Sequence, residues 1–100
     1  MFMLTKEKIF QLIRENKDQL EQFGVKRIGL FGSYVHDKNT YNSDVDLLVE
    51  FNTGKKSFDN YMDLKFYLEK LFDRDVDLVI KDSVKKALRS RVFGSVEYAE

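Results

Sequence analysis

Two aspartates, Asp44 and Asp46, lie two positions apart at the start of an apolar run that continues to Phe51. Successive side chains of a β-strand point to opposite faces, so these two carboxylates would project side by side from one face. Two parallel anions repel each other, and a divalent cation with oxygen ligands relieves that repulsion. The pair therefore predicts a metal site, with Mg²⁺ as the expected ion and substrate phosphate oxygens completing its coordination.

A third carboxylate, Asp77, lies inside another apolar run at residues 76–80. A charged side chain is costly to bury there without a partner, which favours a role for Asp77 as third metal ligand or general base. If the two strands are neighbours, the three carboxylates converge, as metal-assisted phosphoryl-type transfer requires. The alternative is that Asp77 lies with Asp75 on a solvated face at the edge of a sheet.

Gly32 and Ser33 follow directly on the apolar run 28–31, at the end of a strand expected over residues 25–31. Glycine lets the backbone approach a phosphate closely, while a serine at the start of a helical turn offers its hydroxyl and backbone amides to phosphate oxygens. Ser33 taken alone would also fit an ordinary helix cap. Combined with the aspartates that follow, the pair predicts a turn that binds phosphate.

The spacing of apolar residues predicts the elements that must position these groups. Thr5, Ser57 and Ser83 are the expected helix caps, and residues 34–43 read as a polar loop. We expect helices at residues 5–23, 57–73 and 83–91 and strands at residues 25–31, 44–51 and 75–80, with no assignment for residues 92–100. This order predicts an α+β fold, an α/β sandwich in which a short mixed β-sheet packs against helices, within one domain over residues 1–100.

The composition excludes several classes of function. Lysine plus arginine equals aspartate plus glutamate at 17 each, so no global positive field favours binding to nucleic acid. Cysteine is absent, which rules out disulfides and thiolate metal sites. No apolar run approaches the ~20 residues that span a bilayer, and the first residues lack a secretion signal, so we expect a cytoplasmic protein.

The Gly32-Ser33 pair, ten intervening residues and the run from Asp44 to Val49 resemble the signature of the DNA polymerase β superfamily of nucleotidyltransferases. Within it the chain is similar to minimal nucleotidyltransferase domains, the antitoxin-type partners of HEPN toxins. The resemblance extends over nearly the whole chain, including the acidic third strand and a basic segment from Lys85 to Arg91.

This resemblance implies metal-dependent transfer of AMP from ATP to an acceptor, which in antitoxin-type members is a tyrosine of the HEPN toxin. It assigns phosphate binding to Gly32 and Ser33, metal binding to Asp44 and Asp46, and the third acidic position to Asp77. Nucleotide preference, the number of AMP units transferred, and homo- or hetero-oligomeric assembly are left open.

Two adjacent positions depart from the family pattern. Many relatives carry arginine three residues after the serine and glycine next, whereas this chain has His36 and Asp37. The change removes a fixed positive charge from the phosphate loop, which Lys38 could replace. This loss of charge leaves open an alternative to AMP transfer, in which the protein is a non-catalytic antitoxin that neutralises its partner by occluding it. A small-molecule transferase of the aminoglycoside-modifying type is a third reading, although such enzymes generally carry an additional acceptor domain.

Overall fold

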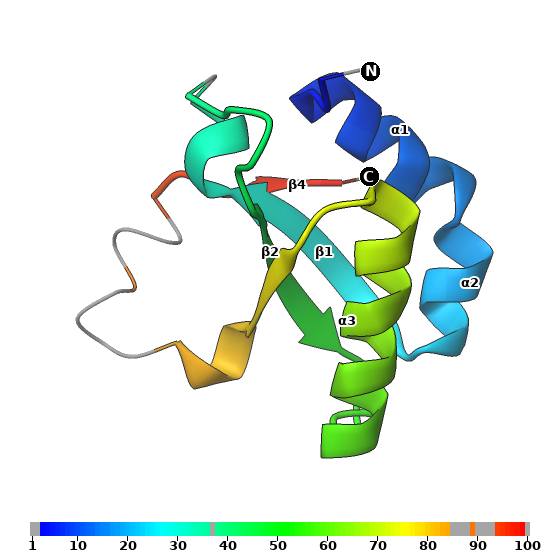
Figure 1. Ribbon diagram of the computed structural model, residues 1–100. Helices are drawn as coiled ribbons and strands as arrows, with labels where there is room; N and C mark the ends of the chain where they lie inside the picture. Colours follow the sequence, from blue (N-terminus) through cyan, green and yellow to red (C-terminus); the bar gives the residue numbers. More distant parts are fainter. Residues whose placement is uncertain (1–2, 37, 85–88, 90–93, 100) are drawn as a thin grey trace.

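The computed structural model describes residues 3–36, 38–84, 89 and 94–99. Its helices are α1 (Lys6–Glu15), α2 (Lys17–Gln22) and α3 (Phe58–Phe72), and its strands are β1 (Val25–Phe31), β2 (Val45–Phe51), β3 (Val76–Ile80) and β4 (Glu97–Tyr98). Two 3₁₀ turns, η1 (Gly32–Tyr34) and η2 (Lys81–Ser83), follow β1 and β3. The three helices lie on one side of the sheet (Figure 1).

The sheet is mixed, with strand order β3-β2-β1-β4. β1 runs antiparallel to both β2 and β4, whereas β2 and β3 are parallel and joined through α3. The predicted α+β fold of a short mixed sheet against helices is confirmed. Because β1 ends where β2 begins, the Gly32-Ser33 turn lies beside the first residues of β2, and the first residues of β3 lie on the far side of β2.

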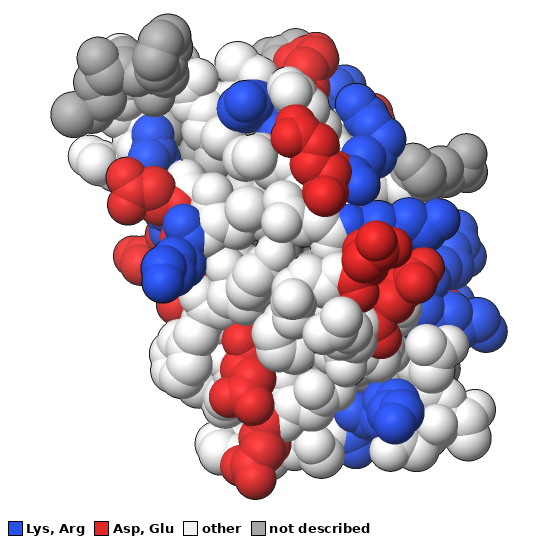
Figure 2. All heavy atoms as spheres, turned by 90° about the vertical axis from the view of Figure 1, so that its right-hand side faces the viewer, with Lys and Arg blue, Asp and Glu red and all other residues white. Residues whose placement is uncertain are grey.

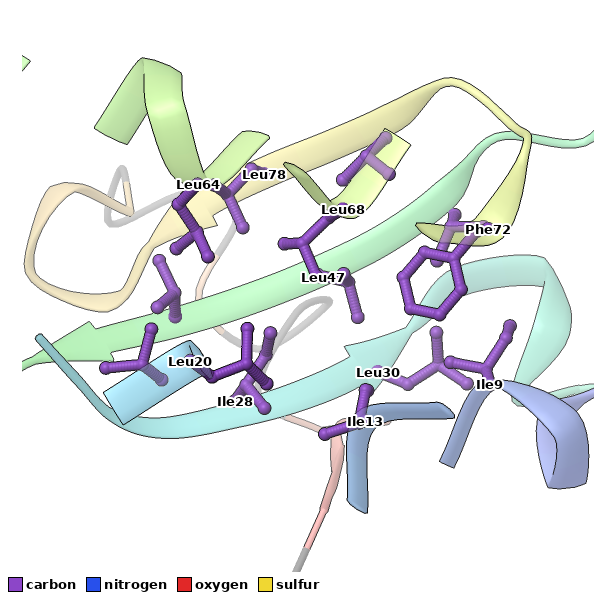
Figure 3. Close-up of a cluster of buried hydrophobic side chains, with 14 of the residues drawn as sticks. Ile9, Ile13, Leu20, Ile28, Leu30, Leu47, Leu64, Leu68, Phe72 and Leu78 are labelled. Atoms are coloured by element: carbon purple, nitrogen blue, oxygen red, sulfur yellow. The ribbon is translucent and has the colours of Figure 1, made fainter. Parts of the chain in front are cut away.

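The hydrophobic core fills the space between the sheet and the helices. Alternate residues of the strands point toward the helices, and α1, α2 and α3 contribute one apolar stripe each. Figure 3 shows this layer, in which Leu30, Leu47, Leu64 and Leu68 are completely buried. A smaller cluster around Leu48 and Val84 covers part of the opposite sheet face. That face is the one that carries the carboxylates.

Two of the predicted helices begin at the expected caps. The Thr5 hydroxyl accepts a hydrogen bond from the backbone N–H of Lys8 at 3.1 Å, and the Ser57 hydroxyl accepts one from that of Asn60 at 3.1 Å. The helix expected at residues 5–23, however, is two helices. At Asn16 the side-chain amide donates to the Leu12 carbonyl at 2.8 Å, and its oxygen accepts from the Tyr67 hydroxyl at 2.9 Å, which fixes the break.

The end of the chain also differs from the sequence expectation. Residues 81–83 form η2 rather than lead directly into a helix capped by Ser83. Of the predicted helix at residues 83–91, Arg89 is described and is helical, and most of the rest lies outside the described residues. β4 was not predicted, because a two-residue strand is too short for an alternating pattern to reveal.

Candidate active site

The site is built around the end of β1 and the beginnings of β2 and β3. Val45 and Leu47 are completely buried toward the helices, so Asp46 between them points to the opposite face of the sheet. In the same way Asp77 lies between buried Val76 and Leu78. Asp46 and Asp77 are direct register partners of the parallel β2–β3 pair, which places their side chains next to each other on that face.

Gly32 touches one of these carboxylates. Its φ is +80°, in the left-handed region, and a Cβ built on it would lie 2.1 Å from Asp46 Oδ2. No other residue could occupy this position without displacing the carboxylate. The same glycine therefore makes the turn and leaves room for Asp46, so the predicted phosphate turn meets one of the predicted carboxylates, Asp46.

Asp44 stands immediately before β2 and is exposed. The next residue, Val45, donates its backbone N–H to the Asp75 carbonyl at 2.9 Å, so the end of the loop is tied to β3. Asp44 also lines a pocket of about 440 Å³ whose other walls are loop residues 41–43, Glu69 and residues 73–75. Asp44, one carboxylate of the predicted pair, thus lines a pocket beside the residues that lead into β2 and β3.

A residue that sequence reasoning did not assign to the site fastens the loop. Tyr34 is buried, and its hydroxyl donates to the Ser43 carbonyl at 3.3 Å. This bond joins the turn that begins at Gly32 to the residue before Asp44 across the loop. An aromatic residue inside an otherwise polar loop was the available signal for this anchor.

The remaining loop residues lie close to the turn. The backbone N–H of Lys38 donates to the Ser33 carbonyl at 2.9 Å, and Ser33 itself is half-buried. His36 is exposed in the turn after η1. The side chain of Lys38 is exposed as well, so a cation stands two residues beyond the position where many relatives have arginine.

Asp77 does not meet the expectation of a buried charge. It is exposed, since β3 is the outer strand of the sheet. Across the described residues, no set of three carboxylate, imidazole or thiol groups is gathered closely enough to hold a metal ion by itself. Asp46 and Asp77 are neighbours in register and Asp44 directly precedes β2, but the structure does not gather the three carboxylates into the closed set of metal ligands that the sequence suggested.

Comparison with known proteins identifies the family of this chain. The nucleotidyltransferase domain family matches residues 11–99. The chain belongs to the nucleotidyltransferase family. It is 42% identical to the protein adenylyltransferase MntA of Thermococcus cleftensis over 98% of this chain and 99% of the relative.

Solved structures give the same result. A structure described as a minimal nucleotidyltransferase matches this chain with a TM-score of 0.79 and 26% identity. The match covers 94% of this chain and 95% of the other. A toxin–antitoxin complex with AMP-PNP matches with a TM-score of 0.70 and 29% identity, over 97% of this chain and 73% of that one. In the described part of the protein, no helix is both long and apolar enough to cross a membrane.

Proposed function

We propose that this nucleotidyltransferase transfers AMP from ATP to a tyrosine hydroxyl of a HEPN-type toxin, and so acts as its antitoxin. The observation that carries the proposal is the contact of Gly32 with Asp46, whose neighbour in register on β3 is Asp77. The 42% identity to a protein adenylyltransferase and the likeness to a toxin–antitoxin complex that holds AMP-PNP support the donor and the partner.

In the proposed reaction Gly32 and Ser33 hold the β- and γ-phosphates of ATP. Gly32 has no side chain to keep phosphate away, and Ser33 offers a hydroxyl and a backbone amide. The acceptor oxygen attacks the α-phosphorus and forms a new P–O bond. The bond from the α-phosphorus to the bridging oxygen breaks, and pyrophosphate leaves with the electron pair.

Asp44 and Asp46 are the proposed ligands of Mg²⁺. Their oxygen donors suit this ion, and the open arrangement leaves positions for phosphate oxygens and water. The chemistry that bound Mg²⁺ supplies is neutralisation of the charge that develops on the phosphates. Asp77, next to Asp46 and open to solvent, completes this site or accepts the proton of the acceptor hydroxyl.

The pocket beside Asp44 is the proposed approach for the acceptor. Its volume of about 440 Å³ admits a tyrosine side chain of the partner, and it reaches the sheet edge between loop residues 41–44 and residues 73–75. The toxin would therefore present its tyrosine at this opening.

The decisive test incubates the protein with MgCl₂, ATP labelled at the α-phosphate, and the HEPN protein encoded beside it. We expect label on the HEPN protein with wild type and a loss of at least about 10³-fold with Asp46→Asn, since a proposed ligand of the Mg²⁺ that neutralises the reacting phosphates is removed. Asp63→Asn, which removes an exposed carboxylate of α3, is the matched control and should transfer normally.

Two further results distinguish AMP transfer from occlusion of the toxin and test the requirement for metal. If Asp46→Asn neutralises the toxin without labelling it, and wild type labels nothing, the protein acts by occlusion and the transfer proposal is wrong. Omission of MgCl₂ in the presence of EDTA should abolish label. Label that persists in EDTA would contradict the metal requirement.

A further inference from the structure

A second concave surface lies away from the catalytic edge. It is a groove of about 480 Å³ between the helices and the first half of β1. Its apolar lining comes from Ile13 of α1, Leu20 of α2, Val25 and Ile28 of β1, and Ala99. Ile28 is four residues before Gly32, so the groove is roughly 13 Å along the strand from the phosphate turn. It is a separate site rather than an extension of the active site.

The charged residues that line this groove are mostly of one sign. Arg14, Lys17, Lys26 and Arg27 contribute four cations, against a single carboxylate from Glu21. The whole chain is electrically balanced, with 17 basic and 17 acidic residues. The positive charge is therefore a local feature of the groove. Figure 2 shows basic side chains gathered along one border of the helical side of the molecule.

Most of these cations have no ion-pair partner among the residues that the structure describes. The ion pairs among the described residues join Lys6 to Glu97 and join Lys26 and Lys81 to Glu50. Of the four groove cations, Lys26 therefore has a carboxylate partner in the described part of the chain. Arg27 is instead held by stacking over the Tyr98 ring, 3.7 Å from its centroid. A positive charge kept in place by an aromatic ring is well suited to receive an anion.

The helix break at Asn16 shapes the groove. Arg14 is in the last turn of α1, whereas Lys17 begins α2. The break is fixed to the body of the protein by the hydrogen bond from the Tyr67 hydroxyl to Asn16. The two cations are thus presented by a rigid corner rather than by a free loop.

We propose that this groove binds a short acidic segment of a partner protein, with aliphatic side chains on the apolar lining and carboxylates at Arg14, Lys17 and Arg27. Charge complementarity selects the acidic partner, and the aliphatic lining selects a protein segment. At roughly 13 Å from the phosphate turn, the segment would hold a partner without covering the catalytic edge. This inference does not require that AMP transfer occurs.

Nucleic acid is the competing anionic ligand, and the lining argues against it. Single-stranded nucleic acid is usually held by aromatic side chains that stack on its bases. None of the ten residues that line the groove is aromatic. A duplex would need a broad basic surface, whereas here the cations surround a concave aliphatic floor.

The test measures fluorescence anisotropy with three labelled probes: a peptide of alternating aspartate and leucine, one of alternating aspartate and serine, and a single-stranded RNA of equal charge. We expect the aspartate–leucine peptide to bind most tightly. The double substitution Arg14→Glu/Lys17→Glu should weaken its binding about tenfold or more, because two attractions become repulsions. Lys8→Glu/Lys56→Glu, which changes two exposed lysines outside the groove by the same charge, should bind as wild type does.

Three outcomes would overturn the proposal: equal binding by the groove variant and wild type, RNA that binds more tightly than the aspartate–leucine peptide, or an aspartate–serine peptide that binds equally well. Circular dichroism shows whether the groove variant is folded. The charge-neutral Arg14→Gln/Lys17→Gln replaces it if it is not. AMP transfer to the HEPN protein is measured in parallel, so that failure of the transfer proposal is seen separately from failure of peptide binding.

Discussion

At the scale of single residues, the contact between Gly32 and Asp46 is the most constrained feature of the site. The turn needs a positive φ at Gly32, and the neighbouring carboxylate occupies the space of a Cβ. Gly54 has nearly the same backbone conformation, with φ +81°, but no atom lies within 4 Å of its hypothetical Cβ. A substitution at Gly54 would therefore introduce backbone strain alone, whereas one at Gly32 would introduce the same strain and also displace Asp46.

We therefore expect Gly32→Ala and Gly54→Ala to have different effects on activity. Each should destabilise the protein by ~1–2 kcal/mol through left-handed strain at a non-glycine residue. Gly32→Ala should also lower AMP transfer by about 10²-fold, because a shift of order 1 Å in a positioning carboxylate has that effect. Urea denaturation and the labelled-ATP assay measure the two quantities. Equal transfer by both variants would show that the contact with Asp46 has no catalytic importance.

Asp77 can be assigned by comparison with its neighbour two positions away. If Asp77 takes part in catalysis, Asp77→Asn should reduce AMP transfer by about 10²-fold or more, whereas Asp75→Asn should leave it unchanged. Both side chains are exposed, so neither change should alter the urea midpoint much. Initial rates at saturating ATP provide the measurement. Parallel, small effects of the two substitutions would favour the solvated-edge explanation.

At the scale of elements, the break between α1 and α2 determines how the helical layer meets the sheet. Asn16 ends α1 with a side-chain hydrogen bond to Leu12, and also accepts the Tyr67 hydroxyl of α3. Phe23 packs on the same tyrosine, with ring centroids 5.3 Å apart. Asn16 therefore connects α1, α2 and α3, and the shape of the groove between the helices and β1 depends on this residue.

Asn16→Ala should destabilise the protein by about 1–2 kcal/mol, since the half-buried Tyr67 hydroxyl loses its acceptor. Tyr67→Phe should cost about 1 kcal/mol, and the double variant should cost less than the sum because the hydrogen bond is lost once. Urea unfolding of the four proteins completes the cycle. Strict additivity would mean that the bond contributes nothing to stability.

At the scale of the whole molecule, a single hydrophobic layer fastens the helices to the sheet. Leu68 of α3 is completely buried within it, whereas Phe66 on the same helix is 58% exposed. Asp46 and Asp77 lie on β2 and β3, and the hydrophobic layer covers the opposite face of these two strands. Loss of core packing should therefore affect the site through the strands.

Leu68→Ala should lower the free energy of unfolding by about 3 kcal/mol, which corresponds to a fall in melting temperature of roughly 12–24 °C for a domain of this size. Phe66→Ala should change the melting temperature by no more than a few degrees. Thermal unfolding followed by circular dichroism tests both. A small effect of Leu68→Ala would mean that the core can close the cavity it leaves.

The sequence by itself determined the chemistry and most elements. The residue types at Gly32, Ser33, Asp44 and Asp46 are read directly from the chain, and β1 was expected at the observed residues because residues 28–31 form a nearly continuous apolar run, typical of a strand buried on both faces. The mixed sheet against helices followed from the order of elements. These features depend on neighbours in sequence, which periodicity and turn residues report.

Only the tertiary structure decided which of these groups meet. The pairing of Asp46 with Asp77, the space that Gly32 leaves for Asp46, and the anchor from Tyr34 to Ser43 all join residues distant in sequence. The helix break at Asn16 belongs with them, since it is stabilised by a tyrosine 51 positions away. Such contacts depend on strand register and packing between elements, which local patterns in a single sequence do not specify.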